Sequence, residues 1–252
     1  MNRSLRIKLL ALALSVSVFT AACSSGTESA DSASEPSSTS AQSEPAEPTE
    51  DMTAEEPTEE EAAEAAPAVD TPAATLTRDL TSLLTSHEHL AGIAVLTAVQ
   101  AGGDLKDPTF EAAAGALDDN SVALSKAIES VYGPEGGEQF LDLWRAHIGF
   151  FVDYTLGKAT DDQKKVKKAS KDLDGYRADF GAFIEGATEG GLPKDAVEEA
   201  LLPHVNMTKS AIDSVVAGDG KAFDKLQKAA NHLSGVATAL SGAIVAQFPD
   251  KF

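Results

Sequence analysis

A threefold repeat of apolar stripes, each with one histidine, constrains the fold of this chain more than any other feature. His87, His147 and His204 lie 60 and 57 residues apart, and the apolar residues around them keep the same spacing. Steps of three and four residues place such side chains on one face of an α-helix. The aligned positions are Leu80, Leu83, Leu84, His87, Leu90, Ala91 and Ala94; then Phe140, Leu143, Trp144, His147, Phe150, Phe151 and Tyr154; then Val197, Ala200, Leu201, His204, Met207, Thr208 and Ala211.

A second set of stripes lies between the histidine stripes and also repeats. Its members are Leu117, Leu124 and Ile128, then Leu173, Phe180 and Ile184, then Leu233, Leu240 and Ile244. Glycines and prolines divide the chain into helices at 76–101, 108–132, 135–157, 161–186, 193–217 and 220–247. We therefore expect an all-α fold, an up-down six-helix bundle built from three repeated helical hairpins, in which the histidine-bearing helices run parallel.

Two local signals add detail to these helices. Thr160 and Gln163 form a capping-box pattern, which predicts the start of the helix at 161–186. Pro203 lies inside the helix at 193–217, and its missing N–H predicts a kink or a restart beside His204.

Residues 1–22 have the layout of a secretory signal peptide. Three basic residues precede the apolar run Leu9–Phe19, which is too short to span a bilayer. The only cysteine, Cys23, follows in the context Thr20-Ala21-Ala22-Cys23, which resembles the lipobox of bacterial lipoproteins and implies lipid attachment at Cys23. The alternative is ordinary cleavage near Ala22, which leaves a free thiol in an oxidising compartment. We expect an extracytoplasmic protein held at the cell membrane by this lipid.

Residues 23–75 are predicted to form a disordered tether between the lipid and a helical domain at 76–252. From Ser24 to Thr75 the chain has fourteen acidic residues and no Lys, Arg or aromatic residue. Such a segment buries too little apolar surface to offset the entropy lost on ordering. The domain itself has 26 acidic and 17 basic residues, a formal charge of −9. This charge argues against nucleic acid as a partner, and no protein partner can be assigned.

The three histidines are candidate metal ligands. On parallel helices they would lie at similar depth, and a group of imidazoles without thiolates suits copper or zinc. His232 is placed to approach as a fourth ligand or as a hydrogen-bonding partner of a ligand. Met207 lies one turn from His204 on the same face and favours copper. The alternative is that each hairpin keeps a histidine in its core for a hydrogen bond, and that the domain is a non-catalytic interaction or structural module of the envelope.

Sequence motifs of enzymes are mostly absent. The chain has no Glu-x-x-His, no His-Glu-x-x-His and no Gly-x-Ser-x-Gly, and its glycine pairs lie at helix ends. These absences argue against a ferritin-like di-iron site, a zinc protease and an α/β-hydrolase. We therefore expect a protein that is not an enzyme.

Two segments, Leu143–Tyr154 and Gly242–Phe252, resemble a family of secreted helical domains from Gram-positive bacteria that often carry the label copper amine oxidase. The similarity extends over most of residues 76–252 and implies a helical domain with an association with copper. A true oxidase of that name makes its quinone from a tyrosine in an Asn-Tyr-Asp/Glu context. Tyr132, Tyr154 and Tyr176 all lack this context, so the resemblance does not include the oxidase catalytic domain.

Overall fold

The computed structural model describes residues 68–252, which are helical with no strand among them. The signal peptide, Cys23 and all but the end of the predicted tether lie outside the described residues. The elements are a short 3-10 helix (Ala68–Asp70), α1 (Pro72–Gln100), α2 (Pro108–Ala159), α3 (Gln163–Ala187), α4 (Lys194–Ala217) and α5 (Ala222–Gln247). The all-α class expected from the stripes is therefore confirmed.

Side-chain caps fix where three of the helices begin. Thr71 accepts a hydrogen bond from the N–H of Ala74, so α1 starts at Pro72, four residues before the predicted start. Asp107 caps α2 in the same way. The cap of α3 is Asp162, which accepts from the N–H groups of Lys164 and Lys165. The capping box predicted at Thr160 is therefore wrong, because the helix starts two residues later than that pattern requires.

Helix α2 contains a break at Gly133, where the chain reverses direction. Gly133 has a φ of 81° and a ψ of 175°, a conformation that L side chains rarely adopt. Beyond it the chain folds back, so that the hydroxyl of Ser125 donates to the carbonyl of Gly137 at 2.8 Å. A Cβ at Gly137 would lie 2.7 Å from the Cβ of Glu129, so the two segments approach more closely than any larger residue allows. The two helices predicted at 108–132 and 135–157 are thus found as one element divided at Gly133.

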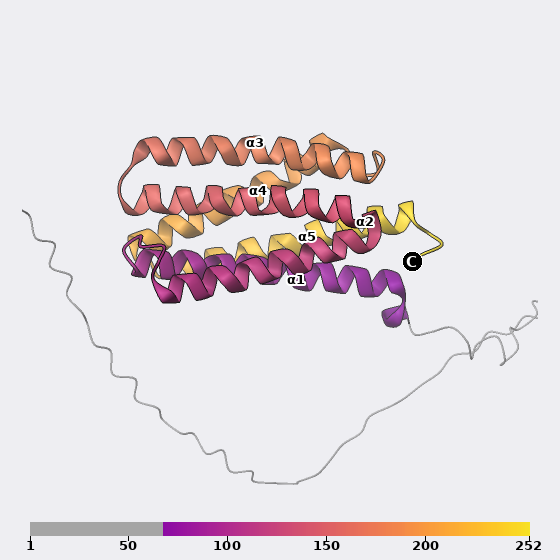
Figure 1. Ribbon diagram of the computed structural model, residues 1–252, viewed down its shortest axis with the longest axis horizontal. Helices are drawn as coiled ribbons and strands as arrows, with labels where there is room; N and C mark the ends of the chain where they lie inside the picture. Colours follow the sequence, from indigo (N-terminus) through magenta and orange to yellow (C-terminus); the bar gives the residue numbers. More distant parts are fainter. Residues whose placement is uncertain (1–67) are drawn as a thin grey trace, which may run out of the picture. The chain divides into compact units, whose positions relative to one another are not determined.

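The helices pack side by side with their long axes nearly aligned (Figure 1). Helix α1 lies between α2 and α5, α3 packs between α2 and α4, and α4 closes the ring against α5. The main apolar core draws on every helix, with Leu80, Trp144, Phe180, Leu201 and Leu240 as one member from each. Burial of each such side chain contributes about 1.5–3 kcal/mol to stability. The histidine stripes face this core and therefore bring their histidines inside.

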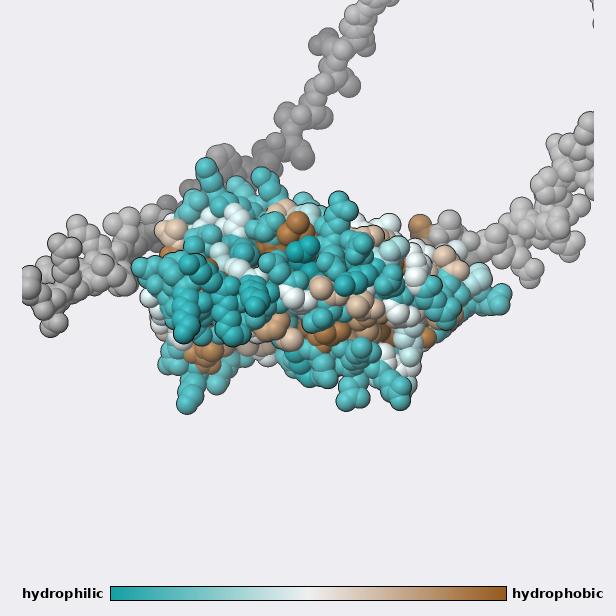
Figure 2. Space-filling view, turned by 90° about the horizontal axis from the view of Figure 1, so that it is seen from above, coloured by the Kyte–Doolittle hydropathy of each residue, from teal (hydrophilic) through white to brown (hydrophobic). Residues whose placement is uncertain are grey.

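The surface is mostly hydrophilic on the face that Figure 2 displays, where small hydrophobic areas are separated by polar side chains. The exposed large hydrophobic side chains lie in different segments of the chain and are Val69, Ile93, Leu105, Leu202 and Phe223. Within residues 68–252, none of the helices combines the length and the hydrophobicity needed to cross a membrane.

Candidate metal site

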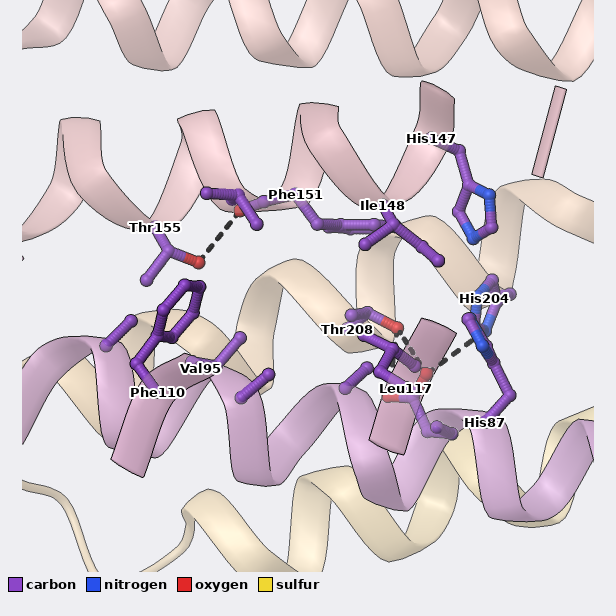
Figure 3. Close-up of a pocket in the computed structure, with 15 residues that line it drawn as sticks. His87, Val95, Phe110, Leu117, His147, Ile148, Phe151, Thr155, His204 and Thr208 are labelled. Atoms are coloured by element: carbon purple, nitrogen blue, oxygen red, sulfur yellow. Dashed lines mark hydrogen bonds and ion pairs between the residues drawn. The ribbon is translucent and has the colours of Figure 1, made fainter. Parts of the chain in front are cut away.

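The three repeated histidines line one small cavity inside the helical domain. His87 comes from α1, His147 from α2 and His204 from α4, and their rings gather at one end of the cavity (Figure 3). Glu88 and Thr208 complete its polar wall, and the remaining lining is mainly apolar. The cavity volume of about 30 Å³ is sufficient for a metal ion or one or two water molecules.

Aromatic rings hold the imidazoles of His87 and His147 in place. The two ring centres are 5.4 Å apart. The indole of Trp144 lies 4.8 Å from the ring of His87 and 4.6 Å from that of His147. Tyr176 of α3 stacks on His147 at 4.7 Å with an interplanar angle of 19°. Packing against Trp144 and Tyr176 therefore holds these two rings in position.

Buried polar atoms without hydrogen-bond partners are concentrated at this cavity. Among the described residues, five such side-chain atoms are found: Nδ1 of His87, Nδ1 of His147, Nδ1 of His204, Nε1 of Trp144 and Oδ1 of Asn120. Four belong to the rings just described. Asn120, whose Nδ2 donates to the carbonyl of Leu83, lies beside His87. Because buried polar groups in proteins almost always have partners, this concentration indicates a place where a ligand or water is bound.

All three imidazoles are neutral near pH 7. Burial, together with the nearby His204, lowers the pKa of His87 to about 3. Burial also lowers the pKa of His204 to about 4, with a smaller effect from His232. The pKa of His147 is held well below its usual value by burial and by the other two histidines. Neutral imidazole is the form that binds metal ions, so no proton has to be displaced from these rings.

Glu88 is a member of the site that the sequence did not predict. Its side chain is 1% exposed, and both carboxyl oxygens accept from the hydroxyl of Thr208, at 3.1 and 3.2 Å. Oε2 of Glu88 lies 3.8 Å from Nδ1 of His204. Burial raises the pKa of Glu88 to about 8, so both groups are neutral at pH 7 and this contact is not an ion pair. The only sequence feature that could have pointed to a polar partner such as Glu88 is the polar Thr208 within the apolar stripe of α4.

Two other residues named from the sequence do not reach the cavity. Nε2 of His232 hydrogen-bonds to the carbonyl of Ala200 at 2.9 Å, so His232 supports α4 and is not a fourth ligand in this structure. Met207 is partly exposed and does not line the cavity. Helix α4 continues through Pro203 from Lys194 to Ala217, so the restart expected beside His204 does not occur.

The side chains around the histidine cavity are not arranged as the ligands of a metal ion. Within residues 68–252, no three His, Cys, Asp or Glu side chains are placed so that together they could hold an ion. The ring centres of His87 and His147 lie 5.4 Å apart, and Oε2 of Glu88 lies 3.8 Å from Nδ1 of His204. Two imidazoles on one tetrahedral ion have ring centres roughly 5 Å apart, and ligand atoms on such an ion are roughly 3.4 Å apart. Metal binding would therefore require these side chains to move.

An outer cleft of about 270 Å³ lies next to the histidine cavity. Arg145 and Asp118 line it and form a bidentate ion pair, with N–O distances of 2.7 and 2.8 Å. The cleft and the cavity share five lining residues, which are Ala94, Phe110, Leu117, Ile148 and Val152. The outer cleft and the histidine cavity are therefore separated only by these side chains.

Comparison of the chain with protein-family models, with curated proteins and with solved structures gave no match. The resemblance to secreted helical domains therefore stays a prediction from the sequence. Function has to be argued from the site itself.

Proposed function

We propose that this protein is an envelope lipoprotein, anchored by a lipid on Cys23, whose helical domain binds copper or zinc through His87, His147 and His204. Its role would be storage, sensing or delivery of the metal outside the cytoplasm. The observation that carries the proposal is the group of three buried imidazoles, each with an unpartnered Nδ1, around one cavity of ionic size.

The chemistry of the donor set supports copper or zinc over other ions. Imidazole nitrogen is a common ligand of both metals, whereas magnesium and calcium prefer oxygen. The rings are neutral and buried, so the imidazoles themselves lose neither an added proton nor a hydration shell when an ion binds. Coordination requires the imidazoles to turn about their side-chain bonds until the three Nδ1 atoms face one point.

The proposed architecture explains why three imidazoles meet. In three repeated helical hairpins forming a six-helix up-down bundle, the histidine-bearing helices are parallel and equivalent positions lie at equal depth. The break at Gly133 supports this architecture, because it divides α2 into two helical segments. Duplication of one hairpin would then place three copies of a single ligand around a common axis.

Fluorescence of Trp144 offers a direct test of metal binding. It is the only tryptophan of the chain, and its ring lies within 5 Å of two of the three imidazoles. Bound Cu²⁺ quenches indole emission at short range, so titration of the full-length protein in detergent should give saturable quenching at one equivalent. Zinc, which does not quench, should raise the melting temperature, since a hundredfold excess over the dissociation constant stabilises a protein by about 2.7 kcal/mol.

Single variants identify the ligands. His87→Ala, His147→Ala and His204→Ala should each abolish the quenching and the zinc-dependent shift. His89→Ala is the matched control, because His89 neighbours the site in sequence but does not line the cavity, and it should behave like the wild type. Failure of the wild type to bind either ion would end the proposal.

The second candidate is a non-catalytic interaction or structural module with core histidines. The contacts of His147 with Tyr176, which is stacked on it, and with Trp144, which meets it edge-on, favour this candidate, because a ring packed in this way resists rotation. This candidate predicts that His147→Ala lowers stability by about 3 kcal/mol with or without metal, through lost packing. It also predicts identical melting temperatures of the wild type in chelator, copper and zinc.

A further inference from the structure

Glu88 is the buried acidic residue of the domain, and its surroundings do not explain it. Among the described residues the only basic side chain within 4 Å of its carboxyl group is His204, at 3.8 Å, and its only hydrogen-bond donor is the hydroxyl of Thr208. No Lys or Arg of this part of the chain pairs with it. Isolated burial of a carboxyl group is costly, and proteins usually avoid it unless the group is paired or binds a metal.

The sequence repeat shows that the fold does not need a carboxyl group there. Glu88 follows His87, and the residues at the equivalent positions, after His147 and His204, are Ile148 and Val205. The repeat positions of Thr208 are occupied by Ala91 and Phe151. Glu88 and Thr208 therefore both depart from the apolar pattern, and they hydrogen-bond to each other. Two polar residues that both replace apolar ones and contact each other point to a function at the cavity.

We propose that Glu88 is the fourth ligand of the metal site, held in place by Thr208, and that it selects a divalent ion, Zn²⁺ or Cu²⁺, over Cu⁺. This inference rests on the proposed histidine site. One carboxylate oxygen binds the ion while the other accepts from Thr208. The distance of 3.8 Å between Oε2 and Nδ1 of His204 is near the roughly 3.4 Å that separates two ligands on one tetrahedral ion.

Charge gives the selectivity. Three neutral imidazoles add no charge, so a divalent ion bound by them alone leaves two positive charges in an apolar core, whereas Cu⁺ leaves one. Glu88 releases its proton to solvent when the ion binds, and the resulting carboxylate offsets one charge of the divalent ion. Since the energetic cost of a buried charge grows steeply with its magnitude, the carboxylate matters most for the divalent ions.

The test measures the affinities of the full-length protein in detergent for Zn²⁺ and, under reducing conditions with a chromophoric competitor, for Cu⁺. Glu88→Ile installs the residue found at the equivalent position of α2. It should weaken Zn²⁺ binding by roughly tenfold or more while leaving Cu⁺ affinity within about threefold. Glu88→Gln, which keeps the shape of the side chain, should have the same effect. Asp79→Asn, on the exposed face of the same helix, is the control.

The outcomes separate this inference from the proposed function. Equal Zn²⁺ affinity in the wild type and both Glu88 variants would overturn the proposal that Glu88 is the fourth ligand, but not the proposed histidine site. Equal losses of Zn²⁺ and Cu⁺ affinity in the variants would overturn the proposal that Glu88 selects divalent ions. Absence of metal binding in the wild type ends both proposals.

Thr208 is a positioning residue, so Thr208→Val should change the Cu²⁺ electron paramagnetic resonance spectrum, and Thr208→Ser should restore it.

Discussion

At the scale of single residues, the proposed function depends on Cys23 for membrane attachment. The apolar run before Cys23 is too short to span a bilayer, so the lipid on Cys23 would be the anchor. We predict that Cys23→Ser moves the protein from the membrane fraction into the medium. The measurement is immunoblotting of cell fractions, with Ser24→Ala as the control. Retention of Cys23→Ser at the membrane would contradict lipid attachment at this residue.

At the same scale, the sequence predicted the histidines but not Glu88, for a physical reason. The positions of His87, His147 and His204 on apolar stripes indicate which way they face, and parallel helices bring equal positions together. Glu88 lies beside the stripe, and its burial depends on how closely α4 packs against α1 through Thr208. Periodicity along one helix carries no information about that distance.

A side chain in the wall of the histidine cavity should control how fast metal enters. Ile148 lines both the outer cleft and the cavity. Ile148→Ala removes side-chain bulk between the outer cleft and the histidine cavity. We therefore predict faster quenching of Trp144 by Cu²⁺ in stopped-flow measurements, with the affinity for Cu²⁺ unchanged. Ile244→Ala, a core truncation that lines neither space, is the control for general loosening. Equal acceleration in both variants would show that the cleft is not the access route.

At the scale of elements, the turn at Gly133 is sensitive to substitution. Its φ of 81° is unfavourable for any residue with a Cβ, so we predict that Gly133→Ala lowers the free energy of unfolding by about 1–2 kcal/mol. Gly149 is the matched control, because it lies in a helix with open space where a Cβ would be. Gly149→Ala should raise stability by about 0.5–1 kcal/mol. Urea unfolding measures both, and equal effects would contradict the role of the turn.

Helix boundaries were the least predictable feature of the elements. The start of α1 was placed at residue 76 because the apolar stripe begins there, whereas the cap at Thr71 adds a polar first turn that periodicity cannot detect. Near Pro203, side chains from two neighbouring helices donate to the carbonyls of the preceding turn: Arg177 to Glu198 and His232 to Ala200. These donors bond to carbonyls near the position where Pro203, which has no N–H, leaves one helical hydrogen bond unformed. Helix α4 therefore continues where the sequence alone suggested a kink or a restart.

At the scale of the whole molecule, the tether and the helical domain should respond differently to protease. The acidic segment lacks the apolar residues needed to fold, whereas the described residues form a packed core. We predict that limited proteolysis with a glutamate-specific enzyme removes the residues before about 68 and leaves a resistant fragment. Mass spectrometry of that fragment measures the boundary. Protection of the glutamates between residues 28 and 64 would contradict a disordered tether.

The stability of the metal-free domain should pass through a maximum near pH 6.5. Below this value the unfolded chain protonates three histidines that the folded domain keeps neutral, because burial lowers the pKa values of His87, His147 and His204. Glu88 acts in the opposite direction, because burial raises its pKa to about 8 and the folded domain keeps a proton that the unfolded chain loses above pH 4.5. His232 of α5 also contributes to the lowered pKa of His204.

The net proton count gives the slopes on either side of this maximum. Between pH 4.5 and 6.5 the unfolded chain holds three protons on the histidines and the folded domain holds one on Glu88, a net difference of two. Stability should therefore fall by about 2.7 kcal/mol for each unit of decreasing pH. Between pH 6.5 and 8 only Glu88 differs, so stability should fall by about 1.4 kcal/mol for each unit of increasing pH. Glu88→Gln should abolish the alkaline slope and steepen the acid slope. Urea unfolding in chelator across this range measures both slopes, and a flat profile from pH 4.5 to 6.5 would mean that the imidazoles are not buried in their neutral form.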